Sequence, residues 1–235
     1  MVNAIILSAG LGTRLGHFTK NKPKCLVEVN NVTMLDHWLS KLSALGVEQF
    51  LINTHYCREL VEEFWKQHPM KNKIHLVEEE HLLGTGGTVK RNIGFFNAEA
   101  NFIVHADNYC QDDLIGMKDL FEDRPTNVCM TMLTFISEKP SECGIVITDK
   151  NNIMTEFYEK VSNPPGNTAN GAVYLCDQSF FKEVEKVGSN VFDLTGKVIQ
   201  KLAGKVNCYH TKAFFADIGT PQSLVSANKF ACSLN

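Results

Sequence analysis

Short apolar runs alternate with amphipathic stretches along the first half of this chain, and this alternation constrains the fold more than any other feature. Val2–Leu7 is a continuous apolar run, typical of a strand that is buried on both faces. Thr33 can cap the next helix, in which apolar residues recur every three or four positions until Gly46. The later elements expected in this half are strands at 49–53, 74–78 and 102–106 and helices at 58–67 and from 84 to about 95. This order predicts an α/β fold, a Rossmann-like, doubly wound and mostly parallel sheet with helices on both faces.

The second half of the chain is richer in strands. The expected strands are 128–135, 144–148, 153–159, 170–175 and a last pair at 206–210 and 214–216, with helices at 178–186, at 194–202 and after Thr220-Pro221. No repeat, low-complexity tract or long linker separates the halves. We therefore expect a single domain over residues 1–235, with halves of about 1–110 and 111–235.

Charge and cysteine content exclude several classes of protein. The 235 residues include 23 Lys and Arg against 26 Asp and Glu, a formal net charge of −3, which excludes a strongly basic nucleic-acid binder. None of the eight cysteines has C-x-x-C spacing, which favours reduced, buried thiols over zinc or disulfides. The opening residues lack the basic region and the long apolar run that a signal peptide would have, and no apolar run approaches the roughly 18 residues of a membrane span. We expect a cytoplasmic protein with no nucleic-acid or membrane partner.

A glycine-rich loop follows the first strand and carries the first chemical signal. Gly10 and Gly12 let backbone N–H groups approach phosphate oxygens closely, and Arg14 adds a rigid fork of donors. Lys24 follows Pro23, whose ring stiffens the backbone before the lysine. The loop lacks both the Walker pattern and the G-x-G-x-x-G spacing of a dinucleotide fingerprint. A plain glycine turn remains the alternative, but the clustered cationic residues favour a phosphate site.

Two aspartates follow predicted strands that are far apart in the sequence. Asp107 comes directly after the strand at 102–106, and Asp217 directly after the one at 214–216. Open α/β sheets bind ligands at the carboxyl ends of their strands. Two carboxylates together with phosphate oxygens form the hard oxygen environment that Mg²⁺ prefers. Either aspartate alone would equally suit a turn or a helix cap, so the prediction of a magnesium site depends on the pair.

Glu159 and Lys160 end a predicted strand, and Asn170-Gly171 follows after a proline-containing loop. A carboxylate beside an ammonium suits a sugar hydroxyl and its phosphate. On these residues alone, an exposed ion pair of little energetic value is the favoured interpretation.

Together these motifs resemble those of the sugar-1-phosphate nucleotidyltransferases, particularly the bacterial mannose-1-phosphate and heptose-1-phosphate guanylyltransferases. The resemblance extends from Ala4 to about Asn228 and is most specific at Gly10-Leu11-Gly12-Thr13-Arg14-Leu15 followed by Lys22-Pro23-Lys24. The supporting motifs, all in family order, are Leu83-Gly84-Thr85-Gly86-Gly87, Asp107, Glu159-Lys160, Asn170-Gly171 and Asp217-Ile218-Gly219-Thr220-Pro221.

The resemblance implies a nucleotide-binding first half and a sugar-phosphate-binding second half. Arg14 and Lys24 would be the catalytic residues, and Asp107 with Asp217 would hold Mg²⁺. The residues that would contact the nucleotide are Leu7, Ala9, Gly10, Gly12, Thr13, Arg14, Glu80, Gly84, Gly87 and Asp107. The residues that would contact the sugar phosphate are Asn108, Gly144, Glu159, Lys160, Asn170 and Gly171.

The implied reaction is attack of a sugar 1-phosphate on the α-phosphorus of a nucleoside triphosphate, with GTP favoured, to form an NDP-sugar and pyrophosphate. Because the attacking phosphate is already anionic, the reaction needs positioning and charge neutralisation rather than a general base. The chain has none of the C-terminal extensions of two-domain relatives, so we expect a minimal catalytic domain.

Other functions are compatible with parts of the pattern. A relative that uses UTP or CTP, with an amino-sugar phosphate or phosphocholine, would share the same loop. A regulatory homologue that binds a nucleotide sugar without turnover would be expected to lose metal or lysine residues, whereas Lys24, Asp107 and Asp217 are present. The glycine spacing excludes an NAD-dependent oxidoreductase. Whether the chain forms a homo-oligomer is left open.

Overall fold

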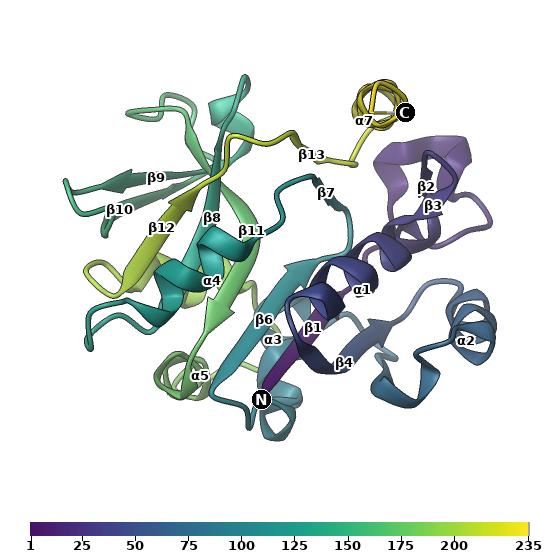
Figure 1. The fold of residues 1–235 in the computed structure, drawn as a ribbon, viewed down its shortest axis with the longest axis horizontal. Coiled ribbons are helices and arrows are strands. Elements are labelled where there is room, and N and C mark those ends of the chain that lie inside the picture. Colours follow the sequence, from purple (N-terminus) through teal and green to yellow (C-terminus); the bar gives the residue numbers. More distant parts are fainter. Residues whose placement is uncertain (235) are drawn as a thin grey trace. The chain divides into compact units, whose positions relative to one another are not determined.

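The structure is a computed structural model that describes residues 1–234 and divides into two compact units (Figure 1). Unit 1 contains residues 1–82, 104–112 and those from 213 onward, and unit 2 contains residues 83–103 and 113–212. Each unit therefore combines segments that are distant in the sequence. The expectation of one domain over residues 1–235 stays a prediction.

The core of unit 1 is a parallel sheet. Its strands are β1 (Val2–Leu7), β4 (Val47–Thr54) and β5 (Ile74–Glu78). Residues 3–7 of β1 and 50–54 of β4 are all buried, as expected for strands covered on both faces. Helix α1 (Met34–Ala44) packs along β1 and β4 (Figure 1). Helix α2 (Arg58–Gln67) contacts β5. Thr33 Oγ1 accepts a hydrogen bond from Asp36 N at 3.0 Å, which confirms the predicted cap of α1.

The remaining elements of unit 1 are short, except for the last helix. They are the 3₁₀ helices Thr13–Thr19, Lys24–Leu26 and Lys71–Lys73, the hairpin of β2 (Glu28–Val29) and β3 (Val32–Thr33), the antiparallel pair of β7 (Asn108–Cys110) and β13 (Phe215–Asp217), and α7 (Pro221–Cys232). Thr220 and Ser223 form a reciprocal capping box at the start of α7, and Pro221 is its first residue, as predicted.

Unit 2 contains most of the strands predicted for the second half of the chain. Its strands pair in the order β10 (Met154–Glu159), β9 (Gly144–Thr148), β11 (Thr168–Cys176), β8 (Met130–Ile136) and β12 (Val206–His210), and only the β8–β12 pair is parallel. Its helices are α3 (Gly84–Arg91), α4 (Ile115–Glu122), α5 (Gln178–Glu185), the short α6 (Leu194–Lys197) and the 3₁₀ helices Ile93–Phe95, Pro140–Glu142 and Ile199–Lys201. β6 (Ala100–His105) leads from unit 2 into unit 1.

The α/β fold class is confirmed, with differences in detail. The helix expected at 194–202 breaks at Val198, whose φ of −119° lies outside the α-helical range, because this short stretch combines glycine with a β-branched residue. The strands expected as a last pair have separate partners, since β12 pairs with β8 and β13 with β7. The loop after β1 contains two 3₁₀ helices, and β7 and α4 were not predicted. None of the helices within residues 1–234 is both long enough and apolar enough to cross a bilayer.

Candidate active site

The pairing of β7 with β13 in unit 1 brings Asp107 and Asp217 together. Asp217 pairs with Asn108 in the antiparallel register, and the Ile218 amide donates to the Asp107 carbonyl oxygen at 2.8 Å. Backbone hydrogen bonds therefore join two segments that lie far apart along the chain. The Ala106 amide donates to the Leu7 carbonyl oxygen at 3.0 Å, which holds the start of this ribbon at the carboxyl end of β1.

The Lys24 ammonium lies between the two carboxylates. Its Nζ is 2.5 Å from Asp107 Oδ2 and 3.2 Å from Asp217 Oδ1. The Lys24 side chain is only 10% exposed, whereas that of Asp217 is 51% exposed, so the cluster is open to solvent on the Asp217 side. Arg14 Nη2 lies 3.8 Å from Asp217 Oδ2. The predicted catalytic and metal-binding residues of the glycine-rich loop, of β6–β7 and of β13 are thus brought together.

The charges in this cluster determine the ionisation of Asp107. Burial by itself would raise the pKa of the Asp107 carboxyl, but the positive charge of Lys24, with a smaller contribution from His105, outweighs it. The pKa of Asp107 is therefore lowered overall, and the carboxylate is ionised at neutral pH. Two cations, Lys24 and Arg14, then balance two carboxylates.

Gly12 allows Lys24 to occupy this position. Gly12 has φ +64°, and a Cβ placed there would lie 3.0 Å from Thr19 Cγ2 and 3.2 Å from Lys24 Cβ. Thr19 Oγ1 donates to the Gly12 carbonyl oxygen at 2.8 Å, which closes the loop over itself. A Cβ added at Gly10 would meet no atom within 4 Å, so packing does not require glycine there. Thr13 and Arg14 are exposed beside them.

A buried polar network supports the start of this loop, and the motifs did not predict it. The Ser8 amide donates to Asn53 Oδ1 at 2.7 Å, and Asn53 Nδ2 donates to Glu79 Oε1 at 3.0 Å. These residues follow or end β1, β4 and β5. The sequence signal that could have revealed this network is a polar residue at or next to the end of each of three neighbouring apolar strands. Leu7 and Ala9, predicted to line the nucleotide, are buried, and Glu80, predicted to lie near the base, is exposed.

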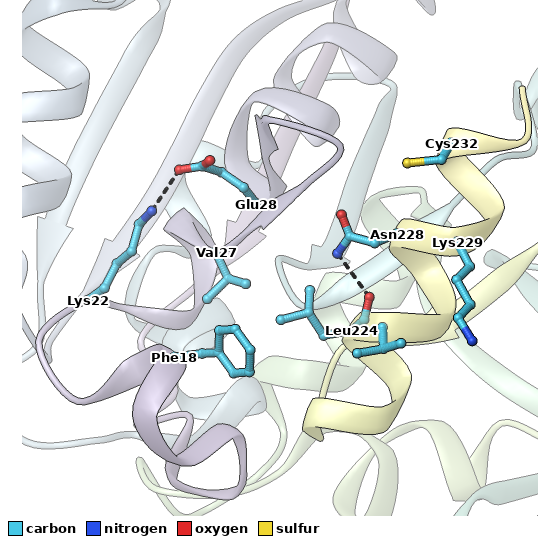
Figure 2. A pocket seen from close by; sticks show the side chains of 9 residues that line it. Phe18, Lys22, Val27, Glu28, Leu224, Asn228, Lys229 and Cys232 are labelled. Atoms are coloured by element: carbon cyan, nitrogen blue, oxygen red, sulfur yellow. Dashed lines mark hydrogen bonds and ion pairs between the residues drawn. The ribbon is translucent and has the colours of Figure 1, made fainter. Parts of the chain in front are cut away.

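An apolar hollow of unit 1 lies apart from this cluster. It measures about 720 Å³ and lies between the 3₁₀ helix Thr13–Thr19 and α7, with Phe18, Val27 and Leu224 on its walls (Figure 2). The ion pair of Lys22 with Glu28, 2.8 Å long, lies at its edge. Because phosphates need donors and cations rather than apolar walls, the Lys24 cluster suits a phosphate ligand better than this hollow does.

His37 on α1 contacts the backbone of β7, and the sequence motifs did not predict this contact. Its Nε2 lies 3.0 Å from the Cys110 carbonyl oxygen, to which a neutral ring protonated at Nε2 donates. Burial, helped by the nearby Lys41 charge, lowers the pKa of His37 to about 4. The ring is therefore neutral at physiological pH.

This buried histidine predicts a specific pH dependence of stability. Between about pH 4 and pH 6.5 the unfolded chain binds a proton at His37 that the folded chain does not, so stability falls as the pH falls through that window. The expected slope is about 1.4 kcal/mol per pH unit from this residue. Denaturant unfolding of His37→Gln should lack that slope, whereas His210→Gln, at an exposed histidine, should retain it. Parallel pH profiles for the wild type and His37→Gln would contradict the prediction.

Five of the six predicted sugar-phosphate residues lie in unit 2: Gly144 on β9, Glu159 at the end of β10 with Lys160 directly after it, and Asn170 and Gly171 on β11. Gly144 pairs with Glu159, and Asn170 is one residue beyond the pair of Ala169 with Ile145. Lys160 Nζ lies 3.6 Å from Glu159 Oε1. Lys160 is exposed and has φ +48°, an uncommon conformation for a residue with a side chain. Asn108, the sixth of these residues, is buried on β7 in unit 1.

Asn170 stabilises an irregularity in β11. The register shifts between Asn170 and Tyr174, and Ala172 has φ +50°. Asn170 Oδ1 accepts from the Ala172 amide at 2.8 Å, and its Nδ2 donates to the Tyr174 hydroxyl at 2.8 Å. This irregularity includes Gly171 and lies in β11, which pairs through Ala169 with β9, the strand of Gly144. Bulges of this kind are over-represented next to active sites.

The glycines at the start of α3 have a packing role in unit 2. The Gly86 and Gly87 amides both donate to the Phe192 carbonyl oxygen, at 2.9 and 3.1 Å. A Cβ on Gly84 would lie 2.6 Å from that oxygen, and one on Gly87 would lie 2.3 Å from the Asn190 carbonyl oxygen. The close approach of residues 190–193 therefore explains why glycine is required at positions 84 and 87. Contact of Gly84 and Gly87 with the nucleotide base stays a prediction.

Replacing Gly87 by alanine should destabilise the protein. The new methyl group would overlap the backbone at Asn190, and overpacking of this kind costs about 1–3 kcal/mol. Gly188→Ala is the matched control, because nothing lies within 4 Å of its added Cβ. Gly87→Ala should unfold at a lower denaturant concentration than Gly188→Ala. Equal midpoints would show that residues 190–193 shift without cost to accommodate the methyl group.

The two carboxylates near Lys24 are suited to Mg²⁺. They converge on a single cationic atom, Lys24 Nζ, and offer hard oxygen ligands. Within residues 1–234 no group of three or more His, Cys, Asp or Glu side chains is arranged to hold a metal ion. Mg²⁺ commonly binds one or two carboxylates and completes its shell with water and substrate phosphates. The donor set therefore fits Mg²⁺ bound together with a phosphate ligand.

Comparisons with known proteins agree with this chemistry. The family model described as "Nucleotidyl transferase" matches residues 3–233. The chain is 27% identical to a mannose-1-phosphate guanylyltransferase of Mycobacterium tuberculosis, over 95% of this chain and 63% of that protein. It is 29% identical to a D-glycero-alpha-D-manno-heptose 1-phosphate guanylyltransferase of Campylobacter jejuni, over 94% of this chain and 96% of that protein. The chain thus spans less than two thirds of the first relative and nearly all of the second.

A solved structure has the same fold. HddC from Yersinia pseudotuberculosis, in complex with GMP-PN, superimposes with a TM-score of 0.78 and covers 98% of this chain and all of that one. The sequence identity is 23%, so this likeness concerns the fold alone.

Proposed function

Because the chain belongs to the nucleotidyl transferase family, we propose that it joins a sugar 1-phosphate to a nucleoside triphosphate. A phosphate oxygen of the sugar 1-phosphate attacks the α-phosphorus, the bond from the α-phosphorus to the bridging oxygen breaks, and pyrophosphate leaves. The products are an NDP-sugar and pyrophosphate. Both relatives described above are guanylyltransferases, which supports GTP as the nucleotide.

The convergence of Lys24, Asp107 and Asp217 beside a glycine loop is the observation that carries this proposal. Two polyanions must meet in the reaction, so cationic donors that are already in place lower the barrier. The Lys24 ammonium neutralises charge on the reacting phosphates. Arg14, whose side chain is 68% exposed, is free to turn its guanidinium from Asp217 to phosphate oxygens.

Asp107 and Asp217 would hold Mg²⁺ together with the triphosphate. Bound there, the ion would supply charge stabilisation at the phosphate oxygens. The amides of the loop at Gly10 and Gly12, together with Thr13, would orient the triphosphate. In unit 2, Glu159 and Lys160 offer an acceptor for sugar hydroxyls and a cation for the sugar phosphate, next to the bulge at Asn170 and Gly171.

Measured pyrophosphate release tests the proposal. GTP, UTP, CTP and ATP are each combined with a panel of sugar 1-phosphates, with Mg²⁺ present and after chelation. We expect turnover with GTP and a hexose or heptose 1-phosphate, and its loss on chelation. Turnover with no combination would favour a regulatory protein that binds nucleotide sugars. Equal turnover after chelation would contradict the carboxylate metal site.

The free cysteines support a reducing compartment, and we place the protein in the cytoplasm. All eight cysteines lie within the described residues and are free thiols, and five of them are buried. Burial raises the pKa of Cys25 and Cys208 to about 12, which keeps these thiols protonated and unreactive. A protein whose cysteines are all free thiols suits a reducing environment.

A further inference from the structure

The Lys24 ammonium occupies the point on which the two metal-binding carboxylates converge. Its Nζ contacts Asp107 Oδ2 at 2.5 Å and Asp217 Oδ1 at 3.2 Å. A divalent ion held by these two carboxylates would compete with the ammonium for the same oxygens. The ammonium and the ion would therefore be alternatives at this position.

The charges of the cluster favour the ammonium while nucleotide is absent. Lys24 and Arg14 already balance Asp107 and Asp217, so a divalent ion alone would add two uncompensated positive charges. A nucleoside triphosphate brings several negative charges. When it arrives with the ion, both the ion and the displaced ammonium have anionic partners.

The backbone and Cβ of Lys24 are held in place, whereas its ammonium group can move. Lys24 starts a 3₁₀ helix in which its carbonyl oxygen accepts from the Val27 amide at 3.1 Å, and its Cβ lies against Gly12. The ammonium, by contrast, ends a flexible four-carbon chain. The exposed side of the cluster, at Asp217, gives phosphates access to it.

We propose that Lys24 is the internal counter-ion of the metal site, which excludes free divalent cations until triphosphate draws the ammonium away. This inference rests on the proposed function. Metal and nucleotide then bind as a cooperative pair, and each raises the affinity for the other by the same factor. Lys24 thus acts in the order of binding as well as in charge neutralisation.

Binding of Mn²⁺ to the nucleotide-free protein, followed by the electron paramagnetic resonance signal of the free ion, tests the proposal. At mildly alkaline pH the wild type should bind Mn²⁺ weakly, and Lys24→Met should bind it at least about tenfold more tightly because one positive charge is gone. Lys22→Met is the matched control. It also removes one positive charge, but Lys22 lies two residues before Lys24 and pairs with Glu28 instead. Its Mn²⁺ affinity should equal that of the wild type. Adding Asp217→Asn to Lys24→Met should abolish the gain.

A second titration, with a non-hydrolysable GTP analogue present, separates this inference from the proposed function. Measured against the same analogue without protein, which itself chelates Mn²⁺, the wild type should then bind Mn²⁺ strongly, and the nucleotide-induced gain should be smaller in Lys24→Met. Equal Mn²⁺ affinities of nucleotide-free wild type and Lys24→Met, with strong binding in the presence of the analogue, would overturn the counter-ion role alone. Absence of Mn²⁺ binding under all conditions, in variants with wild-type thermal unfolding, would overturn the metal site as well.

Discussion

Replacing Lys24 by alanine should lower turnover about 10²–10³-fold, the usual effect of removing one donor that stabilises charge in a transition state. The ammonium lies within 3.2 Å of both carboxylates, so it is positioned where triphosphate and metal would meet. Alanine removes the charge and leaves the 3₁₀ helix at Lys24–Leu26 intact, since its hydrogen bonds come from the backbone. Pyrophosphate release at saturating substrates measures the effect.

Lys22→Ala is the control for this experiment, because Lys22 belongs to the same loop and pairs with Glu28 at the surface. It should turn over at nearly the wild-type rate. Circular dichroism and thermal unfolding establish that the Lys24 variant is folded. Near-normal turnover in Lys24→Ala would remove Lys24 from the mechanism.

Replacing Asp217 by asparagine should cost about 10³-fold in turnover at low Mg²⁺, because a metal supplies several kcal/mol of charge stabilisation and each 1.4 kcal/mol is tenfold in rate. The side chain keeps its shape but loses a negative charge that Lys24 and Arg14 contact. The variant should also require more Mg²⁺ for half-maximal activity. A titration of pyrophosphate release against Mg²⁺ measures both effects.

Asp119→Asn provides the comparison, because Asp119 is an exposed aspartate on α4 in unit 2. Its Mg²⁺ requirement and rate should match those of the wild type. An Asp217→Asn enzyme with an unchanged Mg²⁺ requirement would show that this carboxylate does not hold the ion.

Local patterns in the sequence are sufficient to predict most of the regular elements. The apolar run at Val2–Leu7 predicts a buried strand, and Thr33 and Thr220 are recognisable as helix caps from the residues around them. These signals are local, because burial on both faces and capping depend on residues a few positions apart. The candidate site residues Lys24, Asp107 and Asp217 likewise follow from motifs, and the structure brings them together.

Other features carry no local signal. β7 has three residues, too few for a recognisable pattern, and its pairing with β13 depends on hydrogen bonds between distant segments. The contact of Gly87 with Asn190 and the hydrogen bond of His37 to Cys110 depend on packing in the same way. None of these can be inferred from spacing along the chain.

The sequence by itself therefore determined most of the longer elements (although not α4), the candidate residues for phosphate chemistry and the family to which the chain belongs. Only the tertiary structure decided that both carboxylates face one ammonium and that the glycines of α3 pack against a neighbouring segment. The physical reason is the range of the interactions. Strand burial and helix capping are set by neighbours in the chain, whereas an ion pair between Lys24 and Asp217 exists only after the backbone has folded.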